Sequence, residues 1–179
     1  MPDAVERGVR LAVDVGTVRV GLAASDPDGL LATPVATVAR ARRPAPGERY
    51  RRDLAQIVDE VRERGAVLVY VGLPRHLSGV EGAASEAARA YAGELAQAVA
   101  PVPVRLVDER MSTVTAHQAL RASGMAGRRH RQVVDQAAAV VILQSALDAE
   151  RATGRRPGER VVADPPTHGP AARGGAAGE

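Results

Sequence analysis

The stretch that decides the fold is Leu11-Ala12-Val13-Asp14-Val15-Gly16, where one carboxylate interrupts an apolar run. Large aliphatic residues alternate here with small ones, so a strand places Asp14 on the face that carries the smallest side chains. A buried carboxylate without a partner is costly, by several kcal/mol. We therefore expect an arginine, backbone donors, a raised pKa or a metal ion beside Asp14.

Turn residues divide the beginning of the chain into short strands. Residues 16–18 and 26–29 contain glycine and proline, and they separate predicted strands at 10–15, 19–25 and about 32–38. Strands that follow one another at this spacing are typical of antiparallel hairpins. The basic, proline-broken stretch 40–47 then leads into a helix.

Helices and strands alternate in the rest of the chain. The apolar residues Leu54, Ile57, Val58 and Val61 have helical spacing and predict a helix over about 50–64. The apolar run 67–71 is typical of a strand buried on both faces. Further helices are predicted at 84–99, 112–122 and 134–150, and a further strand at 104–107. The order predicts an α/β fold with a mixed sheet covered by helices.

Length and composition limit the number of domains and the chemistry. A chain of 179 residues with 45% hydrophobic content supports one domain, which we place at residues 1–152. The Gly, Ala, Pro and Arg composition of residues 153–179 predicts a disordered tail. The start of the chain resembles no secretion signal and no apolar run has membrane-spanning length, so we expect a cytoplasmic protein.

Two residue types are missing from the sequence. There is no cysteine, which excludes disulfides, thiol nucleophiles and thiolate metal sites. All 24 basic residues are arginine, which excludes lysine Schiff bases and P-loop lysines. The net charge of +3 is consistent with ordinary solvated faces, but two loops concentrate arginine. They contain Arg40, Arg42 and Arg43, and Arg128, Arg129 and Arg131, and they are either phosphate contacts or solvated charge clusters.

Three acidic residues differ from the others in position. Asp14 lies in the first strand, Glu109 follows a short strand, and Asp135 lies in the first turn of the last predicted helix. Taken singly, Asp135 is explained by the helix dipole and Glu109 by an ion pair with arginine. Taken together, the three can bind a hard cation such as Mg²⁺. A carboxylate-held metal pair would activate a water for phosphodiester hydrolysis without lysine, cysteine or histidine.

Four ordered blocks resemble the signatures of the YqgF/RuvX family, and together they span about residues 8–150. They are Leu11 to Ala23, Val71 to Pro74 with Gly79, Glu81 and Gly82, Val107 to Thr113, and Val134 to Gln144. The resemblance implies a RuvC-like, RNase H-like fold with a five-stranded mixed β-sheet flanked by α-helices. It also implies a nuclease, either one that matures the 5′ end of pre-16S rRNA in ribosome biogenesis or a Holliday junction resolvase.

The resemblance also implies roles for particular residues. Asp14, Glu109 and Asp135 would be the catalytic carboxylates and would hold a divalent metal, Mg²⁺ or Mn²⁺. The nucleic-acid contacts would be Gly16, Thr17, Arg19, Arg75, Arg110, Arg128, Arg129 and Arg131. In the family the loop before the last acid often carries lysine, whereas this chain has arginine there. The glycine turn at Gly16 is equally well explained as a phosphate cradle and as a hairpin turn.

Two other function classes remain open. An actin-like or sugar-kinase-like phosphotransferase has a similar first loop, but such proteins duplicate the domain and this chain has no second copy. A ribosome-assembly or nucleic-acid-binding module could keep the fold without catalysis.

The partners expected are pre-rRNA or branched DNA, with ribosomal particles as a further candidate, and no membrane. Since Phe and Trp are absent, a structured substrate fits better than base stacking. The sequence leaves open whether the protein is a monomer or a homodimer.

Overall fold

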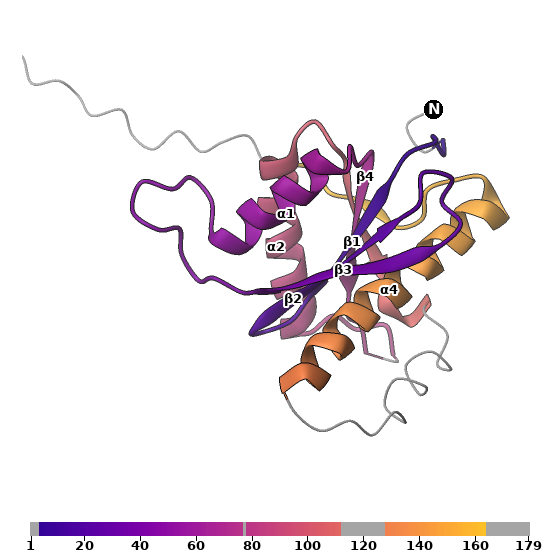
Figure 1. The fold of residues 1–179 in the computed structure, drawn as a ribbon. Helices are drawn as coiled ribbons and strands as arrows, with labels where there is room; N and C mark the ends of the chain where they lie inside the picture. Colours follow the sequence, from indigo (N-terminus) through magenta and orange to yellow (C-terminus); the bar gives the residue numbers. More distant parts are fainter. Residues whose placement is uncertain (1–3, 77, 112–127, 164–179) are drawn as a thin grey trace, which may run out of the picture.

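A mixed sheet with helices on both faces organises the chain (Figure 1). The computed structural model describes residues 4–76, 78–111 and 128–163. Six strands form one sheet in the order β3-β2-β1-β4-β5-β6. The elements are β1 (Arg10–Val15), β2 (Arg19–Ser25), β3 (Ala32–Ala39), α1 (Arg52–Glu63), β4 (Leu68–Leu73), α2 (Ala83–Val99), β5 (Val104–Asp108), the 3₁₀ turn η1 (Glu109–Met111), α4 (Arg128–Thr153) and β6 (Glu159–Arg160).

Strand direction determines which ends of the strands meet. β1 pairs antiparallel with β2, and β2 pairs antiparallel with β3, as the hairpin spacing predicts. β1 pairs parallel with β4 in the register Val13↔Val71, and β4 pairs parallel with β5 in the register Leu73↔Asp108. The carboxyl ends of β1, β4 and β5 therefore lie at one edge of the sheet.

The two faces of the sheet have different cores. Leu11 and Val13 of β1 pack with α1 and α2, where Leu54, Tyr91 and Leu95 are buried. The opposite face is covered by α4. There the small side chains of β1 and β2, Ala12 and Ala23, belong to the core cluster that includes Leu143 and Leu147 of α4. Asp14 follows Ala12 by two residues, so it lies on the α4 face.

A buried polar network fixes the direction of α4. Arg10 Nη2 lies 2.8 Å from Glu150 Oε2, and both side chains are almost fully buried. Tyr70 donates its hydroxyl hydrogen to Glu150 Oε1 over 2.6 Å. Because Arg10 and Tyr70 lie near the amino ends of β1 and β4, the C-terminal part of α4 lies there too. The N-terminal part of α4 therefore extends toward the carboxyl ends of these strands.

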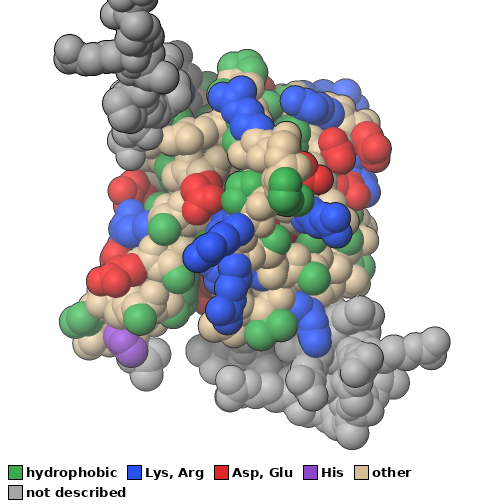
Figure 2. Space-filling view, turned by 90° about the vertical axis from the view of Figure 1, so that its left-hand side faces the viewer, with side chains coloured by type: hydrophobic (Ala, Val, Ile, Leu, Met, Phe, Trp, Pro, Cys, Tyr) green, Lys and Arg blue, Asp and Glu red, His purple; other side chains and the backbone are tan. Residues whose placement is uncertain are grey.

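The connection between β3 and α1 is basic and lies on the surface. Its residues 40–51 include Arg40, Arg42 and Arg43. Figure 2 shows the side of the molecule that carries this connection, and arginine side chains gather near the middle of the view. No helix among the described residues is long and apolar enough to cross a membrane.

Three sequence predictions need correction or lie outside the described residues. α4 begins at Arg128, so residues 128–131 are helical and not a loop. Residues 154–163 are not disordered, because Glu159 and Arg160 add a sixth strand to the five that were predicted. Buried Arg105 explains this order, since it donates hydrogen bonds to Pro157 O (2.8 Å) and Gly158 O (2.5 Å). The predicted helix 112–122 and the tail from residue 164 lie outside the described residues.

Candidate active site

Two of the three predicted carboxylates meet at the carboxyl edge of the parallel strands. Asp14 lies near the end of β1, and Glu109 begins η1 directly after β5. Between β1 and β5 lies β4, which carries Gly72 in this region. Both carboxylates are half-buried, and they are close enough for the charge of Asp14 to shift the titration of Glu109.

The Glu109 side chain packs against Gly72. A β-carbon added at Gly72 would lie 2.7 Å from Glu109 Oε1 and 2.6 Å from Ile142 Cδ1. Both distances are shorter than real β-carbon contacts, so the ends of the Glu109 and Ile142 side chains would have to move to admit a side chain here. Gly72 therefore lets the Glu109 carboxylate lie directly against β4, beneath α4. This function of Gly72 was not predicted from the sequence, although the glycine interrupts the apolar run 67–73.

The electrostatics of the pair favour a bound cation. Burial raises the pKa of the Glu109 carboxyl to about 7, and the nearby charges of Asp14 and Asp108 add to the rise. Two carboxylates in a partly desolvated position repel each other unless a proton or a cation lies between them. Their oxygens are the donors that hard divalent cations such as Mg²⁺ and Mn²⁺ prefer. The donor set thus fits a divalent metal.

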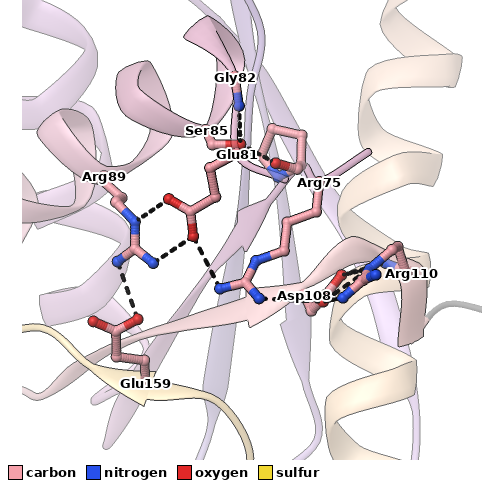
Figure 3. A network of polar contacts seen from close by, with 9 residues as sticks. Arg75, Glu81, Gly82, Ser85, Arg89, Asp108, Arg110 and Glu159 are labelled. Atoms are coloured by element: carbon pink, nitrogen blue, oxygen red, sulfur yellow. Dashed lines mark hydrogen bonds and ion pairs between the residues drawn. The ribbon is translucent and has the colours of Figure 1, made fainter. Parts of the chain in front are cut away.

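Asp108, next to Glu109, forms ion pairs with two arginines (Figure 3). Arg110 Nη2 lies 2.6 Å from Asp108 Oδ2, and Arg75 Nη1 lies 3.9 Å from the same oxygen. Hydrogen bonds from Arg110 hold the pKa of the Asp108 carboxyl below its usual range. Adjacent acids therefore have opposite properties, because Asp108 is a stable anion while Glu109 holds its proton up to about neutral pH.

A wider ion-pair network fixes the loop after β4. Arg75 Nη2 lies 2.9 Å from Glu81 Oε1, and Arg89 of α2 pairs with the same carboxylate. Arg89 also reaches Glu159 of β6 over 3.0 Å. In Figure 3 these contacts form a chain from α2 and the loop to the end of β5. Arg75 and Arg110, which are predicted from the sequence to contact nucleic acid, thus lie next to Glu109 as ion-pair partners of Asp108.

The remaining predicted contacts divide between a turn and a helix. Gly16, Thr17 and Arg19 lie at the β1–β2 turn, directly after Asp14. Gly16 N donates to Arg19 O over 2.9 Å, and a β-carbon at Gly16 would lie 2.5 Å from that oxygen. The geometry of the tight turn thus accounts for the glycine.

For Asp135, the third predicted carboxylate, the structure describes only the backbone. Asp135 lies in α4, two turns before Ile142, which contacts the Gly72 region. The side chains of residues 128–135, which include Arg128, Arg129 and Arg131, lie outside the described part of the structure. Among the described side chains, no group of three or more Asp, Glu, His or Cys residues can hold a metal. The described site is therefore a carboxylate pair.

Comparison with known proteins places this arrangement in a family. Residues 8–149 match the family described as "RuvX: Holliday junction resolvase". A protein of Streptomyces avermitilis named "Putative pre-16S rRNA nuclease" is 55% identical over 157 residues, which cover 88% of this chain and 96% of that protein. One of the same name from Kineococcus radiotolerans is 58% identical over 158 residues, covering 88% and 80%.

A solved structure shows the same fold. Thermus thermophilus RuvC in complex with a Holliday junction substrate has a TM-score of 0.55 and 16% identity, over 84% of this chain and 99% of that one. This likeness confirms the predicted RuvC-like, RNase H-like fold. The match over residues 8–149 and the identity to its relatives show that the chain belongs to the RuvX family.

Proposed function

We propose that the chain is a divalent-metal-dependent nuclease that cleaves phosphodiester bonds of structured RNA, with the 5′ end of pre-16S rRNA as its substrate. The observation that carries the proposal is the Asp14 and Glu109 pair at the carboxyl edge of the parallel strands. The substrate assignment is supported by relatives at 55% and 58% identity that are named for pre-16S rRNA.

Each carboxylate would have a defined part in hydrolysis. Asp14, on the central strand β1, and Glu109, beside Gly72, would hold the metal. Asp135 would supply a third carboxylate from α4. The bound cation would stabilise negative charge on the phosphate and lower the pKa of a coordinated water. Burial and the charges of Asp14 and Asp108 favour the protonated form of Glu109 in the metal-free site, and a bound cation would replace that proton.

The substrate backbone would be held by groups around this edge. The β1–β2 turn with Gly16, Thr17 and Arg19 lies on one side of Asp14. Arg75 and Arg110 lie on the Glu109 side, and Arg128, Arg129 and Arg131 lie at the start of α4. Arginine suits this task because its planar guanidinium binds phosphate oxygens through two parallel hydrogen bonds.

A comparison of metal dependence and variants tests the proposal. Wild-type protein should cleave pre-16S rRNA fragments with Mn²⁺ or Mg²⁺ and should lose this activity in EDTA. Asp14→Asn should abolish cleavage and leave RNA binding largely intact. Asp59→Asn, which removes an exposed carboxylate on α1, is the matched control and should cleave normally. Cleavage that survives both Asp14→Asn and Asp135→Asn would refute the proposal.

Holliday junction cleavage is the second candidate. The description of the matching family supports it. The same preparations, incubated with a four-way DNA junction, distinguish the two substrates when the cut ends are mapped. Symmetric cuts in the junction, with pre-rRNA left intact, would replace our substrate assignment by this one.

A further inference from the structure

A second basic site lies on the other side of the β1–β2 turn. It is a cleft lined by Thr17, Val18, Arg40, Ala41, Arg42 and Arg51. Tyr91, against which two of these arginines pack, belongs to the core on the α1 and α2 face. The carboxylate pair lies on the α4 face, so the turn separates the two sites. The connection 40–51, which supplies Arg40, Ala41, Arg42 and Arg51, lies on the side of the molecule that faces the viewer in Figure 2.

Two of the arginines are held in place before any ligand binds. Arg40 Nη1 donates a hydrogen bond to Gly16 O over 2.8 Å. The guanidinium carbons of Arg40 and Arg51 lie 5.5 and 5.2 Å from the centre of the Tyr91 ring. Cation–π contacts of this kind restrict the rotamers of long side chains. Binding of a ligand here would therefore cost less side-chain conformational entropy than binding at free surface arginines.

The cleft has more positive than negative charge. Arg51 lies 3.7 Å from Asp53 and 3.2 Å from Glu94, and Asp53 also accepts a hydrogen bond from the Tyr91 hydroxyl. These two carboxylates face three guanidinium groups. Arg42 is exposed and has no hydrogen bond or ion pair within the described residues. It is the arginine that can most readily turn toward a ligand.

The charge of Arg51 is shared with acids of the cleft. Its Nε and Nη2 atoms are the ones nearest Asp53 and Glu94, and neither pair has the geometry of a hydrogen bond. Arg51 is also the N-cap of α1, and no side chain caps that helix. The first turn of a helix presents backbone N–H groups that can donate hydrogen bonds to an anion. The arginines of the cleft, which lie next to the first turn of α1, can donate hydrogen bonds to the oxygens of a phosphate.

We infer that this cleft binds a phosphate group of the nucleic-acid backbone at a distance from the cleaved bond. The inference rests on the proposed function, because it takes nucleic acid as the ligand. Asp14 and Thr17 are three residues apart, which is at most about 10 Å of chain. Phosphates of one strand recur at about 3.4 Å along a helix axis. One strand that crosses the turn can thus contact the metal site and the cleft within a few nucleotides.

Binding measurements with charge-removing variants test the inference. All proteins carry Asp14→Asn to prevent cleavage, and labelled pre-16S rRNA fragments are titrated between 50 and 200 mM salt. We expect Arg42→Ala and Arg40→Gln to weaken binding by between about three- and tenfold. Each should also reduce the slope of log K against log salt by roughly one. Arg62→Ala, an exposed arginine at the far end of α1, is the control and should change neither quantity.

The possible outcomes separate the inference from the proposed function. If Arg42→Ala and Arg40→Gln keep the affinity and salt slope of the control, the cleft makes no phosphate contact and the inference is wrong. Because Arg42 is exposed, its variant gives this answer even if Arg40→Gln unfolds.

Inorganic phosphate, added at constant ionic strength, is a second probe. If it stabilises wild type but not Arg40→Gln while RNA affinity is unchanged, the cleft binds free phosphate and the backbone assignment is wrong. Cleavage by the protein with Asp14 intact is measured separately and decides only the nuclease proposal.

Discussion

The Glu109 carboxylate occupies the space that a side chain at Gly72 would need. Its Oε1 atom lies 2.7 Å from the position of a β-carbon on Gly72, and Ile142 of α4 closes the same space at 2.6 Å. β4 therefore positions Glu109 beside Asp14 by lacking a side chain at one position.

Gly72→Ala should reduce both stability and cleavage. The added methyl group must displace Glu109 and Ile142, and overpacking in a tight core is destabilising by about 1–3 kcal/mol. Because displacement also moves Glu109 away from Asp14, we expect the apparent affinity for Mn²⁺ to fall along with the cleavage rate. Urea unfolding and Mn²⁺ titration of activity measure these effects.

Gly93→Ala is the matched control for this substitution. Gly93 lies in α2, and an added β-carbon there would meet nothing within 4 Å. Since alanine favours a helix over glycine by up to about 1 kcal/mol, this variant should be slightly stabilised and fully active. If Gly72→Ala behaves like Gly93→Ala, Gly72 does not position Glu109.

The metal-free protein should lose stability as the pH rises, because of Glu109. Burial, Asp14 and Asp108 raise the pKa of its carboxyl from an ordinary value of 4.5 to about 7. The native state keeps the proton where the unfolded state has released it. The free energy of unfolding therefore falls between pH 4.5 and 7, by at most on the order of 3 kcal/mol, and stays low above pH 7.

Urea unfolding in EDTA at pH 5 and pH 8 measures this effect. Glu109→Gln should become more stable relative to wild type at pH 8, because it cannot ionise. Glu63→Gln, an exposed change on α1, should show no such difference between the two pH values. Added Mn²⁺ should stabilise wild type at pH 8 more than at pH 5. A stability difference between Glu109→Gln and wild type that is equal at both pH values would contradict the assignment.

Tyr70→Phe should destabilise the protein without changing its chemistry. The substitution removes the donor to Glu150 Oε1 and leaves a buried carboxylate oxygen with one partner fewer. The expected loss is about 1–3 kcal/mol in the free energy of unfolding. Tyr50→Phe is the control, because Tyr50 is only half-buried. Equal stability of the two variants would show that the network with Arg10 contributes little to holding α4.

Local patterns predicted the first part of the fold well. Alternating residues and turn glycines predicted strands at 10–15 and 19–25, and both match β1 and β2. The predicted start of the last helix at residue 134 was wrong, because α4 begins at Arg128. Residues 128–131 lack an apolar stripe and resemble a loop in sequence. Helical hydrogen bonds continue through such residues without any hydrophobic pattern to mark them.

The site depended on relationships over long distances in the chain. Asp14 was recognisable alone, because a carboxylate in an apolar strand is unusual. Its proximity to Glu109 requires the parallel pairing of β1, β4 and β5, which no local spacing reveals. The family resemblance supplied that pairing. Neither pattern nor resemblance predicted that Glu109 packs against Gly72 or that residues 154–163 are ordered. Both features arise from contacts between distant side chains and backbone.

Removal of residues 154–163 should destabilise the sheet edge. Arg105 is buried, and it donates hydrogen bonds to the carbonyls of Pro157 and Gly158. Gly158 fits there because it has a φ of +81° and a β-carbon would lie 2.2 Å from Leu106 O. A chain that ends at Thr153 would leave the Arg105 charge without these acceptors, which is expected to be destabilising by about 3–5 kcal/mol. The reference is a chain that ends at Ala163, and urea unfolding compares the two. Arg105→Met in the shortened chain should recover part of the loss, because it removes the buried charge. If the shortened chain is as stable as the reference, residues 154–163 do not support β5.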